Sequence, residues 1–193
     1  MDKKKIRAEI RHRRRTLSPQ QQRQAAEGLS RQVSNLAAFR HARRIALYLG
    51  NDGEIDPLPT LLLAEAAGKR CYLPVLHPLK HNRIHFVPYR SGDRLTVSHF
   101  GYPEPTLAGS RITPAWAMDL ILMPLVAFDA SGNRIGMGGG FYDRTLAFTK
   151  VSPRRPTLIG LAHSCQQLDE IAANPWDIPL DAIATESRVI SCR

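Results

Sequence analysis

The stretch DLILMPLVAFDASGNRIGMGGGFYDR, residues 119–144, decides the expected fold of this chain. It starts with the apolar run Leu120–Met123, which is typical of a strand covered on both faces, and we expect a strand over residues 119–128. The stretch then becomes rich in glycine and ends in Tyr142-Asp143-Arg144. An apolar strand that leads through a glycine-rich loop into a helix is typical of an α/β protein.

The same alternation continues on both sides of that stretch. Short apolar runs predict strands at residues 45–49, 71–75, 83–89, 157–162 and 182–190. Start and stop signals predict helices over residues 3–15, from the capping residue Ser18 to about Phe39, and from Asp56-Pro57 through Ala67, where Gly68 follows. Strands that alternate with helices predict an α/β sandwich with a largely parallel sheet, from which residues 90–118 form an excursion.

The composition is that of an ordinary globular protein. The chain has 193 residues, with 43% hydrophobic and 23% charged residues, which fits one domain over residues 1–193. No apolar run approaches the roughly 20 residues that a membrane span needs, and the start of the chain is charged where a secretory signal would be apolar. Cys71, Cys165 and Cys192 are odd in number and widely spaced, which argues against a disulfide framework or a zinc site. We therefore expect a cytoplasmic protein with no membrane partner.

The positive charge is confined to the beginning of the chain. The formal net charge is +10, and residues 1–44 carry all of this excess. At about 100° per residue, Ile6, Ile10 and Leu17 fall on one face of the first helix. A basic stripe lies beside that face and consists of Lys3, Arg7, Arg11 and Arg14. We expect the basic helices within residues 1–40 to pack on the α/β body and to lean over an anionic ligand.

Two loops are expected to meet at one edge of the sheet. Residues 50–54 and the glycine-rich residues 136–140 both follow apolar strands, and ligands of open α/β sheets bind at the carboxyl ends of strands. Glycine lets backbone N–H groups approach an anion, and Arg134 and Arg144 add charge at the two ends. We interpret this segment as a phosphate-binding loop, although Gly140-Phe141 departs from both the P-loop and the dinucleotide-binding patterns.

Each of these features has a plainer alternative. The glycines alone are consistent with a flexible turn, and Glu54 with a carboxylate that favours a helix start. The basic stripe is consistent with a solvated face or an RNA-binding arm, although residues 1–38 hold no aromatic side chain on which bases could stack. Asp143 and Asp177 are consistent with caps or surface charges, unless the fold brings them near a phosphate, where Mg²⁺ uses one or two carboxylates.

Several ordered motifs over nearly the whole chain resemble the 5-formyltetrahydrofolate cyclo-ligases, also called methenyltetrahydrofolate synthetases. These motifs are Lys3 to Arg7, Ser18, Gly53-Glu54-Ile55-Asp56, Gly101-Tyr102-Pro103-Glu104-Pro105, residues 119–124 and 132–144, Trp176-Asp177-Ile178-Pro179-Leu180-Asp181 and Thr185-Glu186. The resemblance implies a three-layer α/β/α sandwich of the sugar-phosphate isomerase and CoA-transferase type. It also implies a ligase of one-carbon metabolism that converts 5-formyltetrahydrofolate to 5,10-methenyltetrahydrofolate. ATP is consumed, ADP and phosphate are released, and the formyl oxygen is phosphorylated on the way.

The resemblance also implies the site residues. The ATP-binding positions are Lys3, Lys4, Lys5, Ile6 and Arg7, together with Arg134, Ile135, Gly136, Met137, Gly138, Gly139, Gly140, Phe141 and Tyr142. The folate-binding positions are Leu49, Glu54 and Met137 to Phe141, and the magnesium ligands are Asp143 and Asp177. At Met137, Gly139 and Phe141 the chain departs from residues that are common in the family.

The partners implied in this way are small molecules, namely ATP and 5-formyltetrahydrofolate, with Mg²⁺ as cofactor. We expect a monomer that does not act on nucleic acid. Two rival functions stay open on the sequence: an RNA-binding protein that uses its basic first helix, and a sugar-phosphate isomerase or CoA-transferase relative. The second rival needs a catalytic acid or nucleophile on its substrate and has no need of ATP.

Overall fold

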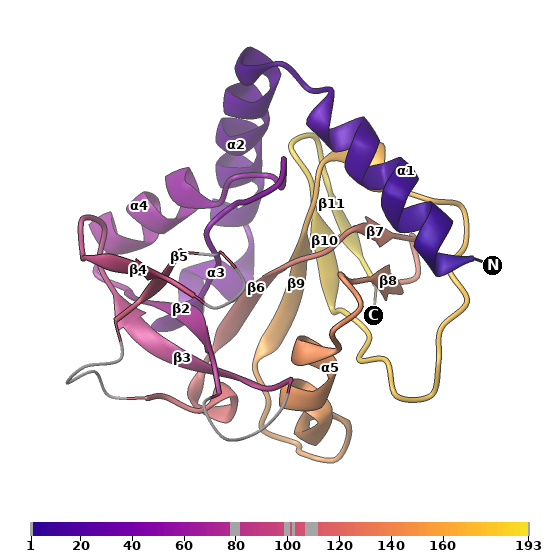
Figure 1. Cartoon of the computed structure of the whole chain (residues 1–193). Helices are drawn as coiled ribbons and strands as arrows, with labels where there is room; N and C mark the ends of the chain where they lie inside the picture. The colour runs from indigo at the N-terminus through magenta and orange to yellow at the C-terminus, as the bar shows by residue number, and fades with distance from the viewer. Residues whose placement is uncertain (1, 78–81, 99–100, 102, 107–111, 193) are drawn as a thin grey trace.

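A mostly parallel sheet of seven strands forms the centre of the computed structural model, which describes residues 2–77, 82–98, 101, 103–106 and 112–192 (Figure 1). In sheet order the strands are β11 (Val189–Ser191), β10 (Ala182–Ala184), β9 (Thr157–Leu161), β6 (Leu120–Pro124), β1 (Arg44–Ala46), β2 (Arg70–Leu76) and β3 (Ile84–Tyr89). The neighbouring pairs from β10 to β2 are parallel, and the two edge strands β3 and β11 are antiparallel to their neighbours. The prediction of a largely parallel sheet is confirmed.

Helices cover both faces of this sheet. On one face lie α2 (Pro19–Ser34), α3 (Ala37–His41) and α4 (Leu58–Ala66), and Leu29 and Leu61 pack there against strand residues such as Leu122. On the other face lie α5 (Phe141–Leu146) and the short helices η1 (Ala115–Ala117) and η2 (Ala147–Lys150), with Leu146 and Met123 in a second core. The continuous apolar strands are therefore buried on both sides, and the three-layer α/β/α prediction is confirmed.

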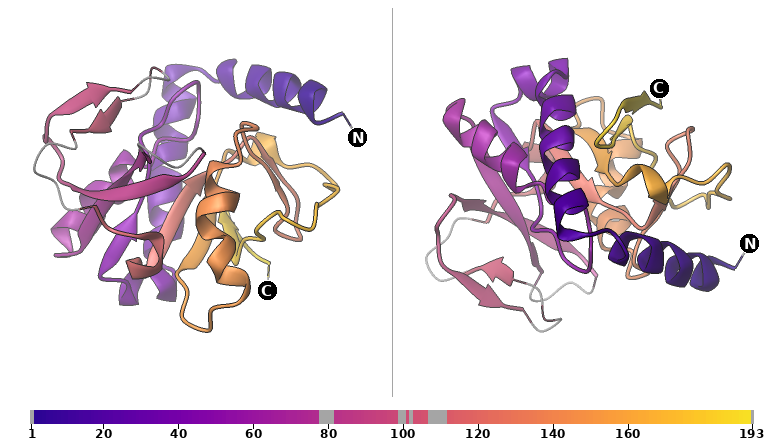
Figure 2. Two further views of the ribbon diagram at one scale, coloured as in Figure 1. Left: turned by 60° about the horizontal axis from the view of Figure 1, so that its bottom comes forward. Right: turned by 90° about the horizontal axis from the view of Figure 1, so that it is seen from above.

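The first helix, α1 (Lys3–Arg15), lies on the outside of this body in both views of Figure 2. The Asp2 side chain caps it by accepting hydrogen bonds from the backbone N–H groups of Lys4 and Lys5. Ile10 is buried in a third apolar cluster, which includes Ile135 and is flanked by Ile6. The cluster joins α1 to a small hairpin of β7 (Ala127–Phe128) and β8 (Arg134–Ile135), since Ala127 and Ile135 of the hairpin are part of it. The predicted apolar face of this helix therefore rests on the segment that leads into the glycines.

The predicted end of the second helix differs from the structure. The capping box of Ser18 and Gln21 is present, but the helix that follows ends at Ser34 and does not run to Phe39. Leu36 adopts an extended conformation, and Phe39 belongs to the separate α3, where it is buried. Asn35 is a weak helix former and is the C-cap of α2, so the chain turns there and can bury Phe39 under the sheet.

Two predicted strands are each divided in the structure. Residues 119–128 form β6 in the central sheet and β7 in the separate hairpin with β8, because the ladder of β6 ends at Pro124 and the chain then leaves the sheet. Residues 182–190 form β10 and β11, which turn back on one another. The predicted strand at 45–49 is shorter than expected, since β1 ends at Ala46.

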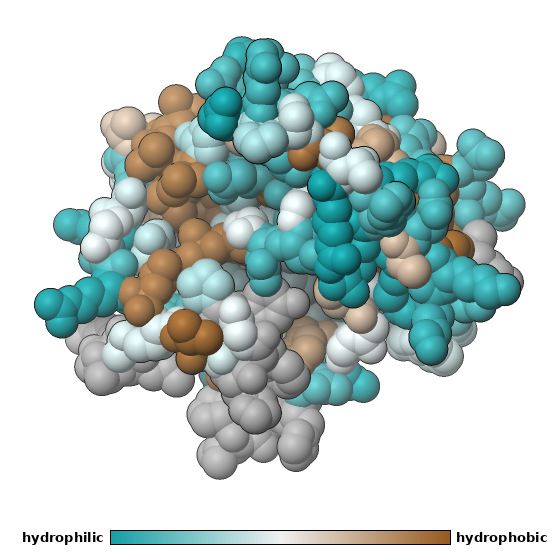
Figure 3. Space-filling view, turned by 45° about the horizontal axis from the view of Figure 1, so that its top comes forward, coloured by the Kyte–Doolittle hydropathy of each residue, from teal (hydrophilic) through white to brown (hydrophobic). Residues whose placement is uncertain are grey.

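The predicted excursion at residues 90–118 contains a hairpin of β4 (Leu95–Val97) and β5 (Pro103–Pro105), followed by η1. Residues 99–100, 102 and 107–111 of this excursion, including Tyr102 of the motif at 101–105, lie outside the described residues. Within the described ranges, no helix combines the length and the apolar character that a membrane crossing requires. Hydrophilic side chains gather on the side where α1 lies, and hydrophobic ones on the opposite side of the same view (Figure 3).

Candidate active site

The glycine-rich segment runs from the end of the β7–β8 hairpin into α5. Asp129 fixes the hairpin turn, because its carboxylate accepts hydrogen bonds from the backbone N–H groups of Ser131 and Asn133. Gly138 has φ +106 and Gly140 has φ +64, a region that favours glycine. A Cβ atom at Gly139 would lie 2.4 Å from the Phe141 ring. The backbone path of this loop therefore depends on its glycines.

Helix α1 contacts this loop through its basic stripe. Arg7 donates a hydrogen bond from Nε to the carbonyl oxygen of Gly136 over 2.8 Å, and its guanidinium carbon lies 3.5 Å from where a Cβ of Gly138 would stand. Lys3 Nζ lies 3.8 Å from a carboxylate oxygen of Asp177. The two segments predicted to bind ATP, residues 3–7 and 134–142, are thus neighbours in space. Lys4 and Lys5 are exposed, and Ile6 packs against the apolar cluster below the helix.

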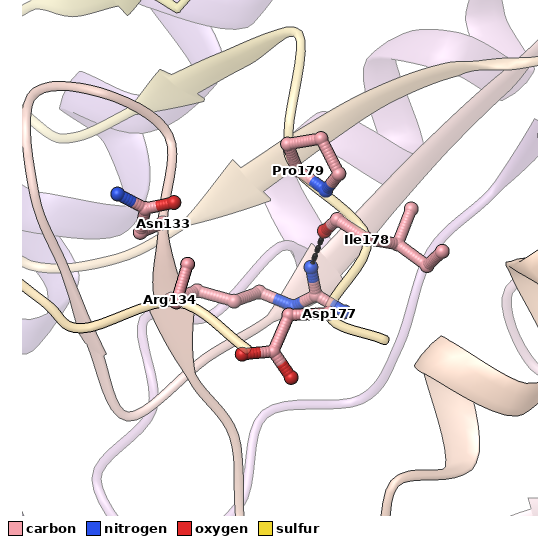
Figure 4. Close-up of a pocket in the computed structure, with 6 residues that line it drawn as sticks. Asn133, Arg134, Asp177, Ile178 and Pro179 are labelled. Atoms are coloured by element: carbon pink, nitrogen blue, oxygen red, sulfur yellow. Dashed lines mark hydrogen bonds between the residues drawn. The ribbon is translucent and has the colours of Figure 1, made fainter. Parts of the chain in front are cut away.

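Arg134 lies beside a small hollow of about 150 Å³, which Figure 4 shows with its lining residues. Its Nη2 lies 2.6 Å from Asp143 Oδ1, and its Nη1 donates to the carbonyl oxygen of Ile178. The backbone N–H of Ile178 donates to the same Asp143 oxygen over 3.1 Å. Asp177, the residue before Ile178, lines the hollow as well. The two predicted magnesium ligands are therefore brought to neighbouring positions.

These carboxylates fit a magnesium ion that is shared with a phosphate ligand. Among the described residues there is no group of three or more His, Cys, Asp and Glu side chains that could hold a metal. Mg²⁺ is usually held by one or two carboxylates plus phosphate oxygens and water, and Asp143 and Asp177 are two carboxylates on segments that the hydrogen bond from the Ile178 N–H to Asp143 joins. These two carboxylates would therefore hold a magnesium ion only when a phosphate ligand supplies further oxygen atoms.

Glu54 lies in the loop at residues 50–54, next to α1. Its carboxylate accepts the backbone N–H of Asn51 over 3.3 Å and lies 3.9 Å from Arg14. Burial raises the pKa of Glu54 to about 7, against the opposing charge of Arg14. Burial also raises the pKa of Tyr142, and the charge of Glu54 raises it further. Leu49, half-buried on the path to this loop, packs against the core.

The remaining predicted residues of the glycine segment differ in their exposure. Met137 is 46% exposed and Gly138 is also on the surface. Phe141 is half-buried and packs against the second core, and Ile135 is fully buried below α1. Gly136 is exposed, and a Cβ there would meet nothing within 4 Å. The exposed part of the loop, residues 136–138, is therefore the part that a ligand can reach.

One residue of this region was missed by the sequence analysis. Asp52, with φ +53, accepts hydrogen bonds from Arg11, Arg14 and Arg15, so it holds the C-terminal half of α1 against the loop at residues 50–54. Burial opposes its ionisation, but the hydrogen bonds from Arg11 and Arg15 lower the pKa of its carboxyl below the usual value. Local sequence gives no signal for this contact. The unbalanced charge of residues 1–44 was interpreted as pointing to an anionic ligand, and not to an acidic residue of the same chain.

This geometry can now be compared with known proteins. A family model described as the 5-formyltetrahydrofolate cyclo-ligase family matches residues 1–186. The chain belongs to this family. It is therefore an enzyme of the cyclo-ligase type, a ligase of folate metabolism, as the motif resemblance implied.

Individual family members agree with this assignment along almost their whole length. The chain is 39% identical over 180 residues to the 5-formyltetrahydrofolate cyclo-ligase of Escherichia coli (strain K12), which covers 93% of this chain and 98% of that protein. It is 40% identical over 178 residues to the enzyme of the same name from Haemophilus influenzae. That alignment covers 92% of this chain and 94% of the Haemophilus protein.

Solved structures of cyclo-ligase family members share the fold. The 5,10-methenyltetrahydrofolate synthetase of Aquifex aeolicus has a TM-score of 0.82 at 32% identity and covers 100% of this chain and 94% of its own. The 5,10-methenyltetrahydrofolate synthetase of Mycoplasma pneumoniae has a TM-score of 0.75 at 25% identity. The superposition covers 96% of this chain and 99% of the Mycoplasma chain. The three-layer arrangement is therefore that of the family.

Proposed function

We propose that this protein converts 5-formyltetrahydrofolate to 5,10-methenyltetrahydrofolate and converts ATP to ADP and phosphate in the process, with the formyl oxygen leaving in the phosphate. The names of its relatives support the folate conversion. The observation that carries the proposal is the hydrogen bond from Arg7 to the carbonyl oxygen of Gly136, which joins the basic first helix to the glycine segment. One short loop would then adjoin both the triphosphate and the folate.

The triphosphate would lie between α1 and the glycine segment. Lys3 to Arg7 and Arg134 to Tyr142 are the proposed ATP-binding residues. Lys3, Arg7 and Arg134 supply positive charge from two sides, and the exposed backbone at residues 136–138 supplies N–H donors. Such donors need no rearrangement to stabilise charge that develops during phosphoryl transfer.

The folate would occupy the side of the loop that faces Glu54. Glu54 and Leu49 are the proposed pterin contacts, with Met137 to Phe141 shared between the two substrates. A carboxylate can accept two N–H groups from the pterin ring, and the half-buried position of Glu54 strengthens such hydrogen bonds. Placed this way, the formyl oxygen of the folate lies toward the γ-phosphate across the glycines.

The proposed reaction activates an unreactive amide. The formyl oxygen attacks the γ-phosphorus, the bond to the β–γ bridging oxygen breaks, and ADP leaves. The N10 lone pair then attacks the formyl carbon, N10 loses its proton, and the carbon–oxygen bond breaks to release phosphate. Since amide oxygens are weak nucleophiles and hydroxide is a poor leaving group, the protein contributes mainly position and charge neutralisation.

Magnesium is the proposed cofactor, with Asp143 and Asp177 as its protein ligands. When bound, the ion would neutralise triphosphate charge and orient the phosphates. Arg134 and Lys3, which pair with these carboxylates, would then turn their charges to the phosphate oxygens. The residues of this chain thereby hold the nucleotide in line with the folate.

The contacts of α1 favour a nucleotide role over an RNA-binding arm. Each member of the basic stripe reaches a group on the body of the protein: Lys3 to Asp177, Arg7 to Gly136, and Arg11 and Arg14 to Asp52. A helix that binds RNA nonspecifically would present these cations outward instead. We further propose that residues 1–193 act as one domain, in line with the family match over residues 1–186, and that the protein is a cytoplasmic monomer.

The decisive experiment is a reconstituted assay of the purified protein. Methenyltetrahydrofolate absorbance should grow only when ATP, Mg²⁺ and 5-formyltetrahydrofolate are all present. Omission of each component in turn is the control. No absorbance change from folded protein would overturn the proposal. Thermal-shift measurements with ATP–Mg²⁺, 5-formyltetrahydrofolate and RNA should show stabilisation by the first two ligands only, and stabilisation by RNA alone would favour the rival function.

A further inference from the structure

A single carboxylate, that of Asp52, gathers three arginines of α1. Arg11 Nε lies 2.7 Å from Asp52 Oδ2, Arg14 Nη2 lies 3.1 Å from the same oxygen, and Arg15 donates to Oδ1. Arg14 Nε also donates to the backbone carbonyl of Asp52 over 2.8 Å. We propose that Asp52 is a positioning residue that couples nucleotide binding to folate binding. This inference rests on the proposed function.

Helix α1 connects the two proposed ligand positions as a rigid link. Its N-terminal half touches the glycine segment through Arg7, and its C-terminal half is held to the loop at residues 50–54 by Asp52. At about 1.5 Å per residue, the helix carries this connection over about 10 Å between Arg7 and Arg14. Ile10, buried between the two contacts, fixes the helix on the β7–β8 hairpin. A ligand that orders one end therefore orders the other.

Arg14 makes this connection specific to Glu54. Its side chain is fully buried, and its Nη2 is shared between Asp52 at 3.1 Å and Glu54 at 3.9 Å. Asp52 therefore competes with Glu54 for this guanidinium. Without the Asp52 charge, the opposite charges of Arg14 and Glu54 would draw together, and the proposed pterin acceptor would be occupied by Arg14.

The surroundings of Glu54 set the expected pH effect. Arg14 and Arg11 face it from α1, Asp52 from its own loop, Tyr142 from α5, and Tyr48 from the chain after β1. The two arginines favour the ionised carboxylate, and burial and Asp52 oppose it. Removal of the Asp52 charge therefore lowers the pH at which Glu54 becomes ionised.

Asp52→Asn is a sharp test because it removes the charge and keeps the backbone. Asp52 has φ +53, and asparagine tolerates this left-handed conformation. Gly53, which follows with φ +73, packs so closely on Arg14 that its Cβ position lies 3.2 Å from the Arg14 carbonyl oxygen. The matched control is Glu9→Gln, which removes an exposed ion pair with Arg13 on the same helix.

The experiment measures the affinity for 5-formyltetrahydrofolate by calorimetry, with and without saturating AMP-PNP–Mg²⁺. In the wild-type protein and in Glu9→Gln we expect the nucleotide analogue to tighten folate binding by at least about fivefold. In Asp52→Asn we expect the two ligands to bind independently, and the pH midpoint of folate binding to move downward. Wild-type coupling in Asp52→Asn, or wild-type protein that binds the two ligands without coupling, would overturn the inference.

A second variant covers the case in which Asp52→Asn does not fold. The double variant Arg11→Gln/Arg15→Gln leaves the buried Arg14 in place and removes the two more exposed partners of Asp52. We expect it to lose the coupling too, and unchanged coupling would overturn the inference. Wild-type protein that binds neither ligand would instead contradict the proposed function itself.

Discussion

The Nε atom of Arg7 donates a hydrogen bond to the carbonyl oxygen of Gly136, 129 residues further along the chain. This contact closes the basic helix over the glycine segment and brings the Arg7 guanidinium carbon to 3.5 Å from the Cβ position of Gly138. A side chain at Gly138 would therefore affect both the backbone path of the loop and the cation that lies over it.

Gly138→Ala should destabilise the protein and weaken nucleotide binding. An alanine forced to adopt the φ of +106 at this position is strained, and we expect a loss of about 1–2 kcal/mol in the free energy of unfolding. The added methyl group would also lie in van der Waals contact with the Arg7 guanidinium, where it would limit the access of a phosphate to this cation. Urea denaturation and calorimetry with AMP-PNP measure the two effects.

Gly136→Ala is the matched control for that variant. A Cβ at Gly136 would meet nothing within 4 Å of the protein, so its effect on the free energy of unfolding should be small. Equal effects of the two substitutions would show that the conformation of Gly138 has no special importance.

Glu54→Gln should separate folate binding from ATP binding. A carboxylate that accepts pterin N–H groups contributes charge-assisted hydrogen bonds, so we expect the affinity for 5-formyltetrahydrofolate to fall about 10- to 100-fold. AMP-PNP affinity should stay near wild type, because Lys3 and Arg7, the proposed phosphate-binding cations, contact Asp177 and Gly136 instead of Glu54. Calorimetry with each ligand tests this, with the exposed Glu27→Gln as control. Equal loss of both affinities would contradict the assignment of Glu54 to the folate.

The raised pKa of Glu54 also predicts a pH dependence of stability. The pKa is about 7 in the folded protein against 4.5 for the unperturbed group, so the folded state binds more protons than the unfolded state between these values. The stability of wild type relative to Glu54→Gln should therefore fall as pH rises from about 5 to about 8, by about 2 kcal/mol. Denaturant unfolding of both proteins across this range measures the difference. A constant difference would show that Glu54 titrates normally.

The parts of the fold that local patterns encode were predicted well. The apolar run at Leu120–Met123 is buried on both faces as its composition indicates, and the Ser18 cap begins α2 where the sequence signals it. The predictions were wrong where contacts between segments distant in the sequence determine the local structure. Nothing in residues 125–128 shows that they leave the central sheet to form the β7–β8 hairpin under α1, and nothing around Asn35 requires the break before α3.

The candidate site was predictable to a similar extent. The stripe of Lys3, Arg7, Arg11 and Arg14 follows from helical periodicity, and all four side chains reach the body. The partner that holds its C-terminal half, Asp52, lies 38 residues from Arg14 in the sequence, and periodicity gives no information about contacts at that separation. The charge imbalance of residues 1–44 predicted an anionic ligand and gave no indication that Asp52 would pair with these arginines.

Asp177→Asn should impair magnesium use without unfolding the protein. The Lys3–Asp177 pair spans 3.8 Å with side chains 29% and 23% exposed, and such a surface pair contributes about 0–1 kcal/mol to stability. Asparagine can still accept the hydrogen bond that the Asn174 backbone N–H now donates to Asp177 over 2.8 Å. The loss of a charged oxygen ligand should raise the Mg²⁺ concentration for half-maximal activity at least about tenfold. Mn²⁺ binding to the AMP-PNP complex, followed by electron paramagnetic resonance, provides a readout that is independent of turnover. Asp169→Asn, at an exposed position, is the control, and an unchanged Mn²⁺ affinity in Asp177→Asn would remove this residue from the proposed metal site.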